Sequence, residues 1–162
     1  SRLDRSKVTS FNLHEGLQST LLLAKHLLKG VTVTKAFGDI APIVCSPSQI
    51  NQVFLNLITN AAQAFGERQG TITLTTRTEG AGVAVEVADN GSGIAPEVLP
   101  KIFDPFFSTK EIGKGTGLGL SISYKIVQQH GGRIDVESKV GSGTRFTVWL
   151  PQKPLPAMDG AS

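Results

Sequence analysis

Apolar residues recur at helical spacing in three segments of the chain. The first predicts an amphipathic helix over residues 12–29. The second predicts a helix over residues 47–65, which the capping residue Ser46 precedes. The third predicts a helix that opens within residues 117–120 and ends at the paired glycines of residues 131–132.

Strand-type alternation predicts two hairpins and a separate strand. The expected strand positions are residues 31–34, 72–76, 83–87, 134–136 and 146–150. Because most strands come as hairpins, a two-layer α/β sandwich is favoured over a doubly wound fold. The sequence thus predicts an α+β fold in which three helices cover one face of a mixed, mostly antiparallel sheet of about five strands.

The length of 162 residues and the 40% hydrophobic content fit one globular domain. We expect this domain to span residues 12–151. Residues 1–11 are expected to be a connector, and residues 152–162 a flexible tail or linker, because prolines recur there and little else could pack.

Charge, cysteine content and the length of the apolar runs argue against nucleic-acid binding and direct membrane contact. The formal net charge is +3, but Lys and Arg form no run and the chain has one Trp and one Tyr, so nucleic-acid binding is not expected. Cys45 is the only cysteine, which favours a reducing, cytoplasmic setting. The apolar runs are too short for a membrane span, so no direct membrane contact is expected, although the domain could belong to a larger membrane-bound sensor.

The second predicted helix carries an uncharged polar stripe. Its members are Gln49, Gln52, Asn56, Asn60 and Gln63. A solvated face is one interpretation, but residues 40–66 contain no charged residue, whereas exposed helix faces usually carry several. Asn56 and Asn60 are four residues apart and share a face, where carboxamide oxygens can bind a hard cation such as Mg²⁺.

Two glycine clusters, over residues 89–93 and 113–119, suggest a phosphate or nucleotide site. Neither fits a P-loop or a dinucleotide-binding motif, because Gly115 stands where a P-loop needs Ser or Thr. Asp89 could simply end a strand at a turn. Alternatively, its carboxylate could accept a hydrogen bond from the exocyclic amine of adenine.

An aromatic segment over residues 102–107 lies between the glycine clusters. It could be a core plug, or the start of a mobile lid whose Lys110 and Lys114 approach phosphates. In the lid interpretation, backbone N–H groups at the start of the third helix, from Gly117 to Gly119, would face the phosphates.

The order of these segments resembles that of the catalytic, ATP-binding domain of sensor histidine kinases in two-component systems. Residues 56–61 resemble the N box of that family, 89–94 the first glycine box and 102–107 the F box. Residues 115–121 and 141–144 resemble the second and final glycine boxes.

The resemblance implies a Bergerat-type sandwich that binds ATP and Mg²⁺. Asn56 and Asn60 are the expected catalytic residues, with Asn60 the metal ligand and Asp89 the adenine acceptor. The expected nucleotide contacts are Asn60, Asp89, Gly91, Gly93, Ile94, Phe107, Lys110, Lys114, Gly115, Thr116, Gly117, Leu118, Gly119, Leu120 and Thr144. Many members have Lys and an aromatic residue where this chain has Gln63 and Ala64, which weakens the expectation of a phosphate contact and a base stack there.

The implied activity is transfer of the γ-phosphoryl group of ATP to a histidine of a separate dimerisation and phosphotransfer domain of the same protein, for relay to a response regulator. His14 is not expected to be that histidine, because it opens a helix of the domain itself. The isolated domain is expected to be monomeric.

Two other functions remain as alternatives. Gyrase-type and mismatch-repair ATPases resemble the chain in their glycine boxes, but they carry a general-base glutamate where this chain has Asn56, so slow hydrolysis is expected here. The second alternative is a nucleotide-binding regulatory module, including an anti-sigma-type serine kinase.

Overall fold

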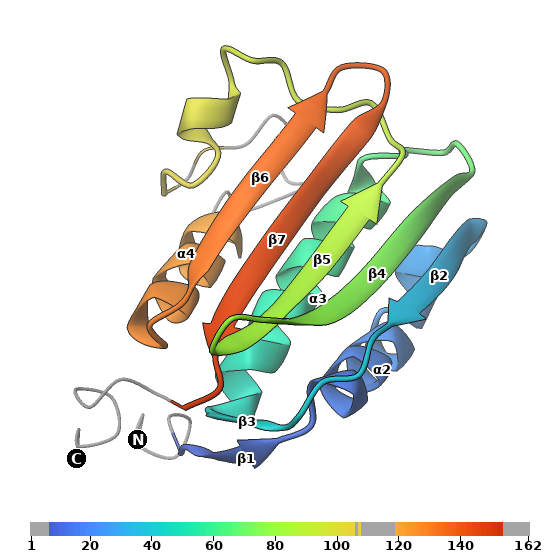
Figure 1. Cartoon of the computed structure of the whole chain (residues 1–162). Coiled ribbons are helices and arrows are strands. Elements are labelled where there is room, and N and C mark those ends of the chain that lie inside the picture. The colour runs from blue at the N-terminus through green and yellow to red at the C-terminus, as the bar shows by residue number, and fades with distance from the viewer. Residues whose placement is uncertain (1–6, 106, 108–118, 154–162) are drawn as a thin grey trace.

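The computed structural model describes residues 7–105, 107 and 119–153, and it has two layers (Figure 1). Helices α2, α3 and α4 cover one face of a five-stranded sheet whose strand order is β2-β4-β5-β7-β6. The elements are β1 (Thr9–Phe11), α2 (Leu13–Leu23), η1 (Lys25–Leu28), β2 (Val31–Phe37), β3 (Ile43–Cys45), α3 (Pro47–Gln63), β4 (Gly70–Glu79), β5 (Gly82–Asp89), η2 (Leu99–Lys101), α4 (Gly119–Gln129), β6 (Arg133–Lys139) and β7 (Gly143–Pro151).

The sheet is mixed, as the sequence predicts. Within the described five-stranded sheet, β2 and β4 pair in parallel, while the β4–β5, β5–β7 and β7–β6 pairs are antiparallel. Alternate side chains of the central strands are buried against the helices, and they include Val83, Val85, Val87, Phe146, Val148 and Leu150. The predicted two-layer α+β sandwich is confirmed.

Helix α3 lies between α2 and α4 and contributes much of the core (Figure 1). Its buried residues are Ile50, Val53, Phe54, Leu57, Ile58, Ala61 and Ala62. The Ser46 hydroxyl caps the helix by accepting from the backbone N–H of Gln49 at 3.5 Å, and Pro47 occupies the first turn. The sequence therefore predicts this helix to within two residues at its C-terminal end.

The start of the chain departs from the prediction. The expected helix over residues 12–29 ends at Leu23 and is followed by the separate 3₁₀ turn η1. The bonding changes there from i→i−4, with the N–H of Ala24 donating to the Thr20 carbonyl at 2.9 Å, to i→i−3, with the N–H of Leu27 donating to the Ala24 carbonyl at 2.8 Å. The apolar spacing continues across this break, so periodicity could not reveal it. Residues 9–11, expected in a connector, form β1 and pair with β3.

His130 joins the ends of two helices inside the core. The side chain is 2% exposed, and the backbone N–H of Ser46 donates to its Nε2 at 3.1 Å. Nε2 must then be the unprotonated nitrogen, so Nδ1–H donates to the Ile126 carbonyl at 2.9 Å. The neutral imidazole thus connects the N-cap of α3 to the last turn of α4.

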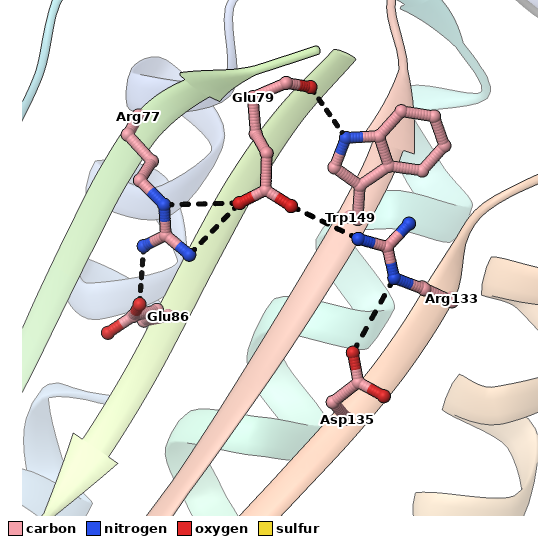
Figure 2. Close-up of polar contacts among 6 residues, drawn as sticks. All are labelled: Arg77, Glu79, Glu86, Arg133, Asp135 and Trp149. Carbon is pink, nitrogen blue, oxygen red and sulfur yellow. Dashed lines mark hydrogen bonds and ion pairs between the residues drawn. The ribbon is translucent and has the colours of Figure 1, made fainter. Parts of the chain in front are cut away.

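The face of the sheet away from the helices is covered by a polar network (Figure 2). Arg77 pairs with Glu86 and, at 3.1 Å, with Glu79, which also pairs with Arg133 at 3.0 Å. Trp149 donates through Nε1 to the Glu79 carbonyl at 2.9 Å. Because these ion pairs are largely solvated, each contributes little to stability, and the network mainly keeps this face polar.

No helix among the described residues is long and apolar enough to span a membrane.

We predict that acid destabilises the fold through His130. In the folded chain, burial lowers the pKa of His130 below its ordinary value of 6.5. When the pH falls below 6.5, the unfolded chain therefore binds a proton at this histidine before the folded chain does. The His130 contribution is therefore complete above pH 6.5 and is lost as the pH falls. Below pH 6.5, the slope of the free energy of unfolding against pH, measured by denaturant unfolding, should be shallower in His130→Gln by up to about 1.4 kcal/mol per pH unit, whereas above pH 6.5 the two slopes should agree.

The matched control for this experiment is His26→Gln, which changes an exposed histidine of η1. A wild-type slope that survives in His130→Gln would contradict the assignment of the buried neutral imidazole.

Candidate nucleotide-binding site

The candidate site starts at the end of β5, where Asp89 is half-buried. Its carboxylate accepts from the backbone N–H of Gly91 at 2.8 Å and from the backbone N–H of Thr144. Burial raises the pKa of Asp89, and these two hydrogen bonds oppose that rise. Asp89 therefore closes the turn and also carries a partly desolvated carboxylate. Its role as an acceptor for adenine stays a prediction.

The turn between β6 and β7 fits tightly against this end of β5. Gly143 has φ +124°, and a Cβ atom there would lie 1.9 Å from the Asp89 carbonyl oxygen. Gly93 has φ +80°, and a Cβ atom there would lie 2.2 Å from the Lys139 carbonyl oxygen. The first and final glycine boxes thus meet through backbone contacts that a side chain would prevent.

Ser138 connects the same two loops through its side chain, and sequence analysis did not identify it. The hydroxyl accepts from the backbone N–H of Ile94 at 2.7 Å and lies 2.7 Å from the Thr144 hydroxyl. Ser138 continues the inward-facing series of Ile134 and Val136 on β6. A polar residue at an inward strand position was the signal that could have found it.

Asn56 contributes to the packing of α3 on α4. Its Nδ2 donates to the Gly119 carbonyl and to the Ser123 hydroxyl, both at 3.0 Å. The predicted polar stripe is therefore not a uniform solvated face: Gln52 is exposed, but Asn56 lies between two helices. Asn60 is half-buried one helical turn further along α3.

The described part of the aromatic segment supports the core-plug interpretation. Ile102 is buried, and the Phe103 ring lies 5.3 Å from the Tyr124 ring and 6.3 Å, edge-on, from the Phe146 ring. Phe107 is half-buried and packs against the core. Most of the predicted lid, which begins at Phe103 and runs to residue 117, lies outside the described residues, so the lid interpretation stays a prediction.

Several predicted contacts lie outside the described residues. They are Lys110, Lys114, Gly115, Thr116, Gly117 and Leu118. Gly119 and Leu120 form the first turn of α4, next to Asn56. The structure therefore brings the start of α4 to the N-box helix, and it brings Gly91, Gly93, Ile94 and Thr144 to the end of β5.

The Asn60 carboxamide oxygen is the kind of ligand that suits a magnesium ion bound together with a nucleotide. Among the described residues, no group of three or more His, Cys, Asp or Glu side chains could hold a metal by itself. Mg²⁺ is commonly bound by one or two protein oxygens together with substrate phosphates and water. The carboxamide oxygen of Asn60 fits that mode, because it adds a hard ligand without adding charge.

Comparison with known proteins identifies the class. Residues 45–154 match the family described as histidine kinase-, DNA gyrase B-, and HSP90-like ATPase. This match covers more than half of the chain and shows that the chain belongs to that ATPase family. Solved structures place it more narrowly, among the catalytic domains of histidine kinases. The nucleotide-free catalytic domain of histidine kinase ThkA is 34% identical, with a TM-score of 0.82, and the match covers 91% of this chain and 97% of that one.

Curated relatives are much longer than this chain. Sensor histidine kinase ZraS of Escherichia coli (strain K12) is 50% identical over 109 residues, which are 67% of this chain and 23% of that protein. Sensor kinase CckA of Brucella abortus (strain 2308) is 43% identical over 148 residues, 82% of this chain and 16% of that protein. The chain thus spans less than a quarter of the length of these relatives.

We predict that Gly143→Ala strongly destabilises the domain. The substitution combines an unfavourable φ with a clash against the Asp89 carbonyl, so the free energy of unfolding should fall by about 3 kcal/mol or more. Gly141→Ala is the matched control: Gly141 has φ +85° but nothing within 4 Å of an added Cβ. The control should lose only about 1–2 kcal/mol. Equal losses in urea unfolding would show that the two loops do not meet as described.

Proposed function

We propose that the chain binds Mg²⁺·ATP between α3, the end of β5 and the start of α4. The observation that carries the proposal is the half-buried Asp89 carboxylate, which two backbone N–H groups hold in place. A partly desolvated acceptor of this kind recognises a base that carries an exocyclic amine, as adenine does. Asp89 and Gly91 lie in the segment that resembles the first glycine box, Thr144 lies in the one that resembles the final glycine box, and the family model that spans both is one of ATPases.

Asn60 is proposed as the ligand of the metal, and the start of α4 is proposed to lie beside the phosphates. Bound Mg²⁺ would neutralise negative charge that builds up on the phosphate oxygens during transfer. In the described turns after β5 and before β7, glycines would let backbone N–H groups approach a ligand without side-chain obstruction. The predicted contacts from residues 110–118 and from Phe107 belong to this proposal.

We propose that the phosphoryl group passes to a histidine outside this chain. His14 is unsuited, because its ring stacks on Phe37 at 4.3 Å and its Nε2 lies 2.8 Å from the Thr76 hydroxyl. His130 is buried in the core. The acceptor would belong to a dimerisation and phosphotransfer domain of the same protein.

Relay to a response regulator and a cytoplasmic location complete the proposal. A structure of histidine kinase ThkA in complex with the response regulator protein TrrA contains a domain like this one, at 30% identity and a TM-score of 0.77. The catalytic unit is proposed to span residues 12–151 together with β1, which pairs with β3, and the isolated domain is proposed to be monomeric.

The position of Asn56 supports phosphoryl transfer over rapid hydrolysis. An amide is not basic at neutral pH, so it cannot deprotonate water as a glutamate could. Its Nδ2 is also engaged with Gly119 and Ser123 on α4. A hydrolytic ATPase therefore remains a weaker second candidate.

We predict that Asp89→Asn weakens ATP binding about ten- to a hundredfold in isothermal titration calorimetry. The variant loses the charge of the acceptor, and its amide NH₂ would oppose one of the backbone N–H donors. Asp135→Asn, on the exposed face of the sheet, is the matched control and should bind ATP like the wild type. Unchanged affinity in Asp89→Asn would remove Asp89 from the site.

We predict that the chain, mixed with Mg²⁺·ATP and its cognate phosphotransfer domain, places an acid-labile label on histidine. Asn60→Ala should abolish this Mg²⁺-dependent transfer. Acid-stable label on serine would favour the serine-kinase alternative. Rapid ATP hydrolysis by the chain alone that Asn56→Ala abolishes would favour the hydrolytic ATPase instead.

A further inference from the structure

Ser138 lies where the first glycine loop, the final glycine turn and the adenine end of the site meet. One hydroxyl has three close partners: the Ile94 N–H at 2.7 Å, the Gly143 carbonyl at 3.0 Å and the Thr144 hydroxyl at 2.7 Å. A serine hydroxyl has one proton to donate and two lone pairs to accept with. These partners therefore fix how the protons are arranged.

Only one arrangement of the two hydroxyl protons forms all three of these hydrogen bonds. The Ile94 N–H must donate to Ser138, and the Gly143 carbonyl can only accept, so the single Ser138 proton goes to Gly143. The Thr144 hydroxyl must then donate its own proton to Ser138. Thr144 is 7% exposed, and its remaining lone pairs are all that its hydroxyl can offer to a ligand.

This arrangement bears on base recognition because Thr144 pairs directly with Asp89 across β5 and β7. Side chains of directly paired residues project from the same face of a sheet, with Cβ atoms about 4.5–5.5 Å apart. The Asp89 carboxylate is an acceptor, and the Thr144 hydroxyl is restricted to accepting. Two adjacent acceptors favour a base that presents an amine and disfavour one that presents a carbonyl oxygen.

We propose that Ser138 is a positioning residue that sets base specificity by orienting the Thr144 hydroxyl. The proposal rests on the proposed function, because it assumes that the base of ATP lies at the Asp89 end. Ser138 itself need not contact the nucleotide. Without the Ser138 acceptor, the Thr144 proton could turn toward the base and donate to a 6-oxo group.

The test compares Mg²⁺·ATP with Mg²⁺·ITP, whose hypoxanthine base carries a carbonyl oxygen in place of the amine. Affinities of the whole chain for both are measured by calorimetry. The wild type should prefer ATP, and Ser138→Ala should reduce the ATP/ITP affinity ratio by about three- to tenfold. Ser138→Thr keeps the hydroxyl and should retain the wild-type ratio. Asp135→Asn, on the solvent-exposed face of the same strand β6, is the control and should leave the ratio unchanged.

A second substitution separates orientation of Thr144 from a general loosening of the loops. In a Thr144→Val background there is no hydroxyl to orient, so adding Ser138→Ala should leave the ATP/ITP ratio as it is in Thr144→Val alone. A ratio that still falls in that background would overturn the proposal. So would a folded Ser138→Ala that loses affinity for both nucleotides equally. If the wild type binds neither nucleotide, the proposed function itself fails and the specificity role with it.

Discussion

The close contact between the Gly143 turn and the end of β5 is the constraint on which the site depends. A Cβ atom at Gly143 would lie 1.9 Å from the Asp89 carbonyl, so the two segments can meet only through glycine. Because they meet, the Thr144 N–H reaches the Asp89 carboxylate, and Ser138 reaches the Ile94 N–H. The Asp89 carboxylate is thus positioned by backbone packing within the chain itself.

The other side of the site depends on the packing of α3 against α4. Asn56 ties the two helices together at the site, and His130 ties them at the opposite end through Ser46. Since α3 also packs against α2 and the sheet, the helix that carries Asn60 is held along its length. If Asn60 and Asp89 have the roles proposed for them, their fixed positions suit phosphoryl transfer, which depends mainly on positioning and charge stabilisation.

The sequence predicted the sheet, its hairpins and α3 because their signals are local: alternation, turn glycines and a capping serine. It did not predict β1 and β3, since three-residue strands are too short to alternate, nor the change to a 3₁₀ turn after Leu23. Motif order predicts roles for Asp89 and Asn60, and these roles stay predictions. The hydrogen-bond partners of Asn56, Ser138 and His130, by contrast, are long-range contacts. Such contacts, 44 residues apart for Ser138 and Ile94, have no signature in local spacing.

The central claim is that Asp89 holds the amine of adenine. Its most direct test is a crystal structure of the chain with Mg²⁺ and a non-hydrolysable ATP analogue. We predict that the exocyclic amine nitrogen lies about 3 Å from a carboxylate oxygen of Asp89, with the phosphates toward Asn60 and the start of α4. A base bound elsewhere, with the Asp89 carboxylate facing solvent or only its own loop, would contradict the account.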